Sequence, residues 1–179
     1  MNLSHRWIAA CAAALGVLAA GDAALAQTSS TGTGTASIAI GNALTIDRTS
    51  DLSFGKLVVA NPASPASVTV GTANAVTGIS NATEVAGAAI NSASFTVTGV
   101  GGSSYAVTFP QSSITLGAGA NPPTLDSFSS NPAGSVGQLS GNSSGVGTQT
   151  LSVGGVLHLP ANTPAGAYSG AFQVGVSYN

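Results

Sequence analysis

The end of the chain alternates between two kinds of side chain, and this period of two restricts the fold more than any other feature. Over residues 168–178, apolar residues and glycine take turns with small or polar residues. Such a period places successive side chains on opposite faces of a β-strand. The sequence therefore predicts a closing strand with one apolar face, formed by Tyr168, Gly170, Phe172, Val174, Val176 and Tyr178.

Shorter pieces of the same pattern fill the rest of the chain. Runs rich in valine, isoleucine and threonine are separated by proline- and glycine-containing turns such as NPASP, GAGANPP and SNPAG. No apolar stripe with the 3.6-residue period of a helix extends over a useful length. Many short strands between such turns are typical of an all-β fold, and we expect an antiparallel β-sandwich without long helices. Besides the closing run, strands are expected at 38–46, 52–60, 67–70, 94–99, 104–110, 112–116, 125–130 and 150–159.

The first 26 residues have the organisation of a secretory signal peptide. A short basic start, MNLSHRW, precedes the apolar run IAACAAALGVLAA, and ALA before Gln27 has the form of a signal-peptidase site. The apolar run is shorter than the about 20 residues that a spanning helix needs. We expect residues 1–26 to be removed, no membrane span to remain, and the protein to reach the periplasm, the cell surface or the extracellular space.

Two further regions follow the signal peptide. Residues 27–37, QTSSTGTGTAS, are polar and low in complexity, which predicts a flexible leader. Residues 38–179 are long enough to form one domain with its own core. The single cysteine, Cys11, lies in the predicted signal peptide, so disulfides and thiol chemistry are excluded for the exported chain.

Charged residues are scarce. They make up 4% of the chain, whereas an average soluble domain is about one-quarter charged. No basic patch is present that would bind nucleic acid. Because charges on edge strands are one guard against unwanted strand pairing, we expect the sheet edges of this protein to be open to other chains.

The residues that carry chemistry in other proteins form no recognisable catalytic or metal site here. His158 has no cysteine, aspartate or glutamate near it in the sequence, and a zinc site needs three or four ligands. Asp47, Arg48 and Asp51 offer oxygen ligands for a cation, but their spacing matches no calcium loop and indicates a solvated turn. With no paired carboxylates and no nucleophile–base set, we expect a protein that is not an enzyme and uses no cofactor.

Two weaker patterns concern sugars. NAT at Asn81 and NSS at Asn142 are glycosylation sequons, which mark surface loops only where the host glycosylates them. Exposed tyrosines stack on sugars, but Tyr105, Tyr168 and Tyr178 each lie in an alternating pattern that favours the core.

Several stretches together resemble the exported bacterial proteins grouped as domain of unknown function 4402. They are DLSFGKL at 51–57, FTVTG at 95–99, YAVTFP at 105–110 and the ending from LSVGG at 151 to Asn179. The resemblance implies an immunoglobulin-like, pilin-like β-sandwich, related to spore-coat-U-type and fimbrial subunits and without established enzymatic activity.

The ending is also similar to the C-terminal signature of chaperone–usher pilins, which have a penultimate aromatic residue and a glycine fourteen residues from the end. Tyr178 and Gly166 occupy these positions. This similarity implies a periplasmic chaperone and an usher as partners, and a homo-polymer as the product. The cysteine pair of many pilins is missing, and the leader lacks the alternating apolar residues of a donor strand. Any donor strand must then be 38–46, with Ile38, Ile40, Leu44 and Ile46 on one face and Asn42 interrupting it.

Two functions of different classes remain open at this point. The first is a fimbrial subunit that polymerises by strand exchange, in which the closing strand borders a groove, the donor strand of another subunit fills it, and the ring of Tyr178 covers its last pocket. The second is a self-contained periplasmic or surface binding domain, whose closing strand is paired within its own chain. The strand-pairing residues of the first hypothesis are Ile38, Ile40, Leu44, Ile46, Gly166, Tyr168, Phe172, Val174, Val176 and Tyr178.

Overall fold

The structure is a computed structural model that describes residues 33–134 and 136–179. The predicted signal peptide and residues 27–32 of the predicted leader lie outside the described residues. The chain divides into two compact units, Met1–Ile38 and Ala39–Asn179. In the first unit, residues 33–38 are exposed and belong to no strand; every strand of the described chain lies in the second unit.

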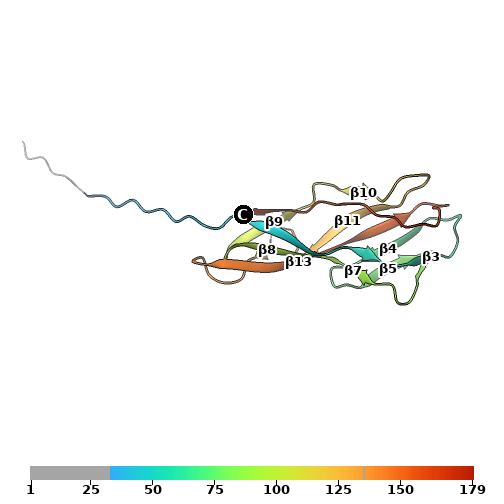
Figure 1. Ribbon diagram of the computed structural model, residues 1–179, viewed down its shortest axis with the longest axis horizontal. Coiled ribbons are helices and arrows are strands. Elements are labelled where there is room, and N and C mark those ends of the chain that lie inside the picture. Colours follow the sequence, from blue (N-terminus) through green and yellow to red (C-terminus); the bar gives the residue numbers. More distant parts are fainter. Residues whose placement is uncertain (1–32, 135) are drawn as a thin grey trace, which may run out of the picture. The chain divides into compact units, whose positions relative to one another are not determined.

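A seven-stranded antiparallel sheet dominates the second unit (Figure 1). Its main path has the order β1 (Thr45–Ser50), β8 (Ala93–Val100), β13 (Val146–Leu159), β11 (Thr124–Asn131) and β10 (Ser113–Thr115). Off this path, β4 (Ala66–Val70) pairs with β13, and β5 (Val76–Ser80) pairs with β4. Strand β4 shows why these sequences form half-buried strands, because Ala66, Val68 and Val70 are buried while Ser67 and Thr69 between them are only partly buried.

Three smaller antiparallel sheets accompany it. One has the order β12 (Gly137–Gln138), β9 (Ser104–Thr108) and β14 (Gly175–Tyr178). The other two are the pairs β2 (Ser53–Phe54) with β7 (Ile90–Asn91), and β3 (Leu57–Val59) with β6 (Ala82–Glu84). The described chain contains no helix, so the prediction of an all-β antiparallel fold is confirmed.

The core contains two clusters of buried side chains. The first joins the large sheet to the β12–β9–β14 sheet, since Val97 and Leu151 of the one pack with Tyr105 and Val107 of the other. The second is formed by four residues around β10, β11 and β13: Ile114, Leu116, Leu125 and Leu157. Phe172 contacts both clusters, and its ring stacks on that of Phe128 with centroids 5.2 Å apart.

The first predicted strand is wrong in its position. It was expected at 38–46, but β1 begins at Thr45 and ends at Ser50. Upstream of Thr45 the hydroxyl of Tyr178 donates a hydrogen bond to the carbonyl oxygen of Asn42, over 3.0 Å. It also accepts one from the backbone N–H of Val100, over 2.7 Å. The side chain of Tyr178 therefore lies between the segment before β1 and the end of β8, where the β1–β8 ladder would otherwise continue.

The closing strand and the strand at 52–60 are shorter than predicted. Strand β14 covers only Gly175–Tyr178, because residues 168–174 have no continuous ladder partner among the described residues. The run 52–60 is divided into β2 and β3 at Gly55, whose φ of 66° lies in the left-handed region that glycine adopts without strain.

Candidate functional site

A groove with a volume of about 1190 Å³ lies over the second core cluster. Small-molecule pockets typically measure about 300–1,000 Å³, so the groove is large for such a ligand. Its floor is apolar. The floor consists of Leu125 of β11, Leu157 of β13 and Leu116, the residue that follows β10, and these side chains are 3%, 6% and 8% exposed. The groove therefore lies above side chains that are already buried in the second core cluster.

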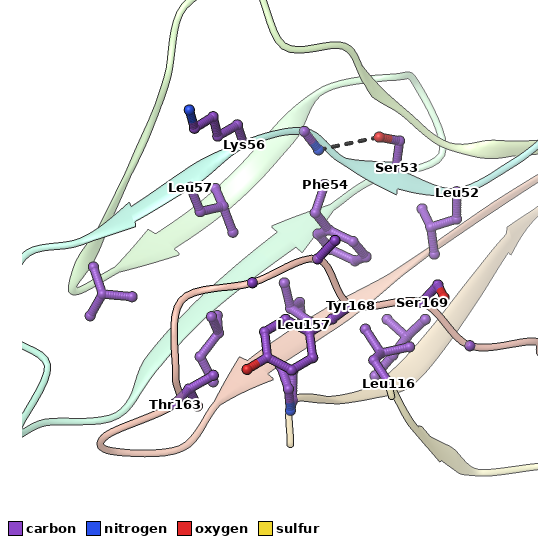
Figure 2. Close-up of a pocket in the computed structure, with 18 of the residues that line it drawn as sticks. Leu52, Ser53, Phe54, Lys56, Leu57, Leu116, Leu157, Thr163, Tyr168 and Ser169 are labelled. Carbon is purple, nitrogen blue, oxygen red and sulfur yellow. Dashed lines mark hydrogen bonds between the residues drawn. The ribbon is translucent and has the colours of Figure 1, made fainter. Parts of the chain in front are cut away.

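Two chain segments form the walls of the groove. The first wall, residues 52–59, contributes Leu52, Phe54 and Leu57, and the second wall, residues 163–172, contributes Tyr168 and Phe172. Figure 2 shows Phe54 and Leu57 projecting from the first wall towards the space that Tyr168 enters from the second. These five side chains are half-buried, so they leave apolar surface open to an occupant.

Backbone hydrogen bonding explains why the two walls stay apart. Among the described residues, the first wall pairs on its outer side only, through β2 with β7 and β3 with β6. In the second wall, residues 165–172 make one backbone–backbone hydrogen bond with the rest of the described chain. It runs from the N–H of Gly117 to the carbonyl oxygen of Ser169, over 2.9 Å. No backbone hydrogen bond of the described residues joins residues 52–59 to residues 163–172. Each wall thus has a backbone edge available for pairing.

One end of the groove is closed by two loops. The N–H of Asn162 donates to the carbonyl of Pro62 over 2.7 Å, which joins the turn after β13 to loop 60–65. The side chain of Asn81 fixes loop 60–65: its Oδ1 accepts from Asn61 N at 2.9 Å, and its Nδ2 donates towards the carbonyls of Asn61 at 2.9 Å and Ser64 at 3.0 Å. This asparagine, first noted as a sequon, therefore has its amide engaged inside the domain.

Charges lie at the rim of the groove. Arg48 and Asp51 form an exposed ion pair 2.5 Å apart, with side chains 65% and 71% exposed. Such a pair contributes little to stability because water and salt screen it. Lys56 points away from the groove in Figure 2. The walls and floor thus offer an occupant apolar contacts and backbone groups.

Apart from Tyr178, the predicted strand-pairing residues are found in three places. Gly166, Tyr168 and Phe172 line the groove, while Val174 and Val176 pack on the first core cluster. Of the predicted donor residues, Leu44 and Ile46 also pack on that cluster. Ile38 and Ile40 are 88% and 90% exposed.

Tyr178 does not cover a pocket of the groove, contrary to the expectation from its place at the end of the closing strand. It lines a separate small hollow with Val100 and Ser104, and its side chain reaches β8. The reason is Gly99, which has no Cβ where the tyrosine hydroxyl lies.

The structure also places the other residues that the sequence singled out. The Nε2 atom of His158 lies 3.1 Å from Oδ1 of Asp126, which comes from the neighbouring strand and so was not visible as a sequence neighbour. The described residues contain no group of three or more His, Cys, Asp or Glu side chains that would hold a metal ion. Tyr105 is fully buried and donates to Oε1 of Gln149 over 2.9 Å, so it offers no face to a sugar. Burial raises the pKa of the Tyr105 phenol.

Sequence reasoning missed the first wall and the floor of the groove. The period-2 pattern of Leu52 and Phe54 shifts by one residue after Gly55, so that the side chain of Leu57 rather than that of Lys56 points into the groove (Figure 2). A glycine within an alternating run was the available signal, because it often marks a bulge or bend in a strand.

Comparisons with known proteins give one match. The family described as Domain of unknown function (DUF4402) matches residues 44–178. Neither the search of the curated proteins nor the search of the solved structures found a match. Within the described residues, no helix is long and apolar enough to cross a membrane.

Proposed function

This chain belongs to the DUF4402 family, and we propose that it is a non-enzymatic, exported cell-surface subunit that assembles by β-strand complementation. In this proposal the domain is an immunoglobulin-like sandwich whose second layer lacks one strand over Leu157. The observation that carries it is the groove of about 1190 Å³, whose two walls have no backbone hydrogen bond between them in the described chain. An extended segment placed between the walls would pair with both of them, which is the geometry of β-strand addition.

The energetics favour an occupant that is a strand. Each backbone hydrogen bond gained along a wall contributes a net of about 0.5–1.5 kcal/mol. Apolar side chains that cover Phe54, Leu57 and Tyr168 add about 25 cal/mol for each Å² removed from water. Successive side chains of a strand point to opposite faces. Every second side chain of an inserted strand would therefore face the apolar floor, and the floor would favour apolar residues spaced by two.

The donor residues of the proposal are fewer than the sequence indicated. Leu44 and Ile46 support the core of their own domain, so donating them would unfold β1. Ile38 and Ile40 have the required spacing and are almost fully exposed. We therefore assign the donor role to the segment that contains Ile38 and Ile40 of a second copy, with a periplasmic chaperone and an usher as the partners that would hold the groove before assembly.

The test compares two double variants of the exposed segment. Ile38→Asp with Ile40→Asp places charges on the face that would enter the groove, and Ser37→Asp with Ala39→Asp places the same charges on the opposite face. Polymer recovered from the cell surface and the oligomeric state of the purified protein are measured. The first variant should abolish polymer and the control should retain it, since neither pair contributes to the core of its own domain.

Two results would contradict the proposal. Equal loss, or equal retention, of polymer in both variants would mean that the alternation of the segment has no role. A parent protein that is secreted as a monomer, folds unaided and forms no polymer would favour the self-contained binding domain.

A further inference from the structure

The last tyrosine joins three parts of the domain that are far apart in the sequence. Tyr178 belongs to β14, which pairs with β9. Its hydroxyl accepts a hydrogen bond from the N–H of Val100 at the end of β8, 2.7 Å away. The same hydroxyl donates to the carbonyl of Asn42, upstream of β1, 3.0 Å away. One oxygen atom thus connects the closing strand, β8 and the segment that leads into β1.

The hydroxyl stands where the ladder between β1 and β8 would otherwise continue. In that ladder Thr45 lies opposite Thr98 and Ile46 lies opposite Val97. If the ladder continued for two more residues upstream of Thr45, Ala43 would lie opposite Val100. The N–H of Val100 binds the phenol instead of a carbonyl of the upstream segment. The side chain therefore replaces a rung of the sheet, and β1 begins only at Thr45.

Gly99 makes this arrangement sterically possible. A Cβ atom at this position would collide with the Tyr178 hydroxyl and would lie 3.0 Å from Cδ1 of Leu44. The upstream segment is also closely packed at Gly41, where a Cβ atom would lie 2.7 Å from Cγ2 of Val100. The residues from Gly41 to Leu44 are thus fitted to the end of β8 although they form no strand with it.

We propose that Tyr178 is a clamp that fastens the segment before β1 to the domain at Asn42, directly downstream of the exposed residues 33–41. Upstream of the clamp, Ile38 and Ile40 are exposed; downstream, Leu44 and Ile46 pack on the core. The clamp is independent of the proposed assembly, because it describes how the chain leaves its own domain. If the chain does donate a strand, the clamp limits the donated part to residues before Asn42.

The test is the variant Tyr178→Phe, which keeps the ring and removes the hydroxyl. Hydrogen exchange of the Val100 amide, followed by NMR in the otherwise intact protein, should become about 2- to 10-fold faster, the range expected for the loss of one net hydrogen bond. Trimming of the folded protein by a protease of broad specificity should stop near Asn42 in the parent and near Thr45 in the variant, as mass spectrometry of the resistant core would show.

A matched control is Tyr168→Phe. Tyr168 is half-buried whereas Tyr178 is 39% exposed, and the hydroxyl of Tyr168 likewise donates to a backbone carbonyl, that of Pro164, over 2.7 Å. Its loss should leave the exchange of Val100 and the trimming point unchanged. Gly99→Ala should reproduce both effects of Tyr178→Phe with the hydroxyl still present, because the added methyl group displaces it.

Three outcomes would overturn the clamp. They are an unchanged exchange rate of Val100 in Tyr178→Phe, an equal change in Tyr168→Phe, and a trimming point that stays at Asn42 without the hydroxyl. Failure of Gly99→Ala to fold would not affect these measurements, since the two phenylalanine variants add no atoms to the core. Failure of strand donation leaves the clamp intact, so the two proposals can be rejected separately.

Discussion

Replacing Asn81 with glycine should destabilise the protein and open the closed end of the groove. The Asn81 side chain accepts one backbone hydrogen bond and donates towards three carbonyls, those of Asn61, Ser64 and Pro65, over 2.9–3.2 Å. An Nδ2 group has only two hydrogens, so about three bonds act at full strength. Glycine removes all of them but keeps the backbone conformation, because Asn81 has a φ of 52° that glycine adopts without strain.

The magnitude follows from these bonds. At a net of about 0.5–1.5 kcal/mol each, three hydrogen bonds amount to a loss of about 1.5–4.5 kcal/mol. For a domain of this size, a loss of that order lowers the melting temperature by about 5–15 °C. Loop 60–65 would be released, and with it the hydrogen bond from Asn162 N to Pro62 O that closes the groove.

The assay is thermal unfolding followed by circular dichroism, with amide exchange of Asn162 as the local probe. Asn121→Gly is the matched control, because Asn121 has a similar φ of 49° and its side chain makes no hydrogen bond among those of the described residues. That control should change the melting temperature by only a few degrees. Equal shifts for Asn81→Gly and Asn121→Gly would refute the reasoning, since the side-chain amide would then not be what holds the loop.

Two further predictions concern the core around Tyr105. Tyr105→Phe should cost about 0.5–1.5 kcal/mol in urea unfolding, because it removes the hydrogen bond to Gln149. Burial raises the pKa of this phenol above its usual 10.0. Its contribution to the free energy of unfolding should therefore persist below about pH 10 and be lost as the pH rises through the raised value. An equal decline of the free energy of unfolding at alkaline pH in the parent and in Tyr105→Phe would contradict this. Gly137→Ala should cost about 1–3 kcal/mol, because a Cβ atom there would lie 2.6 Å from Cε1 of the Tyr105 ring. Gly145→Ala, where the nearest atom is 4.0 Å away, should be nearly neutral, and equal melting temperatures for the two alanine variants would refute the packing argument.

Local pattern was sufficient for part of the candidate site. The alternation of the closing run predicted an inward face, and Phe172, Val174 and Val176 of that face do pack on the core clusters. Tyr178, predicted on the same face, is 39% exposed. It did not predict where the ladder stops, because residues 168–174 have the same alternation as β14 but lack a neighbouring strand over their length in the described chain. A side-chain period shows a strand-like face, whereas a strand also needs a second backbone at hydrogen-bonding distance.

The sequence by itself determined the fold class of this protein and the composition of its faces, because alternation, β-branched residues and turn residues act over a few neighbouring positions. Only the tertiary structure decided which faces meet. Three examples are the place of the first wall beside the groove, the pairing of His158 with Asp126 and the fit of Tyr178 over Gly99. Each depends on contacts between residues that lie more than thirty positions apart or on separate strands. Such contacts depend on which strands become neighbours in the sheets, and strand order is set by the packing of the whole domain rather than by any single segment.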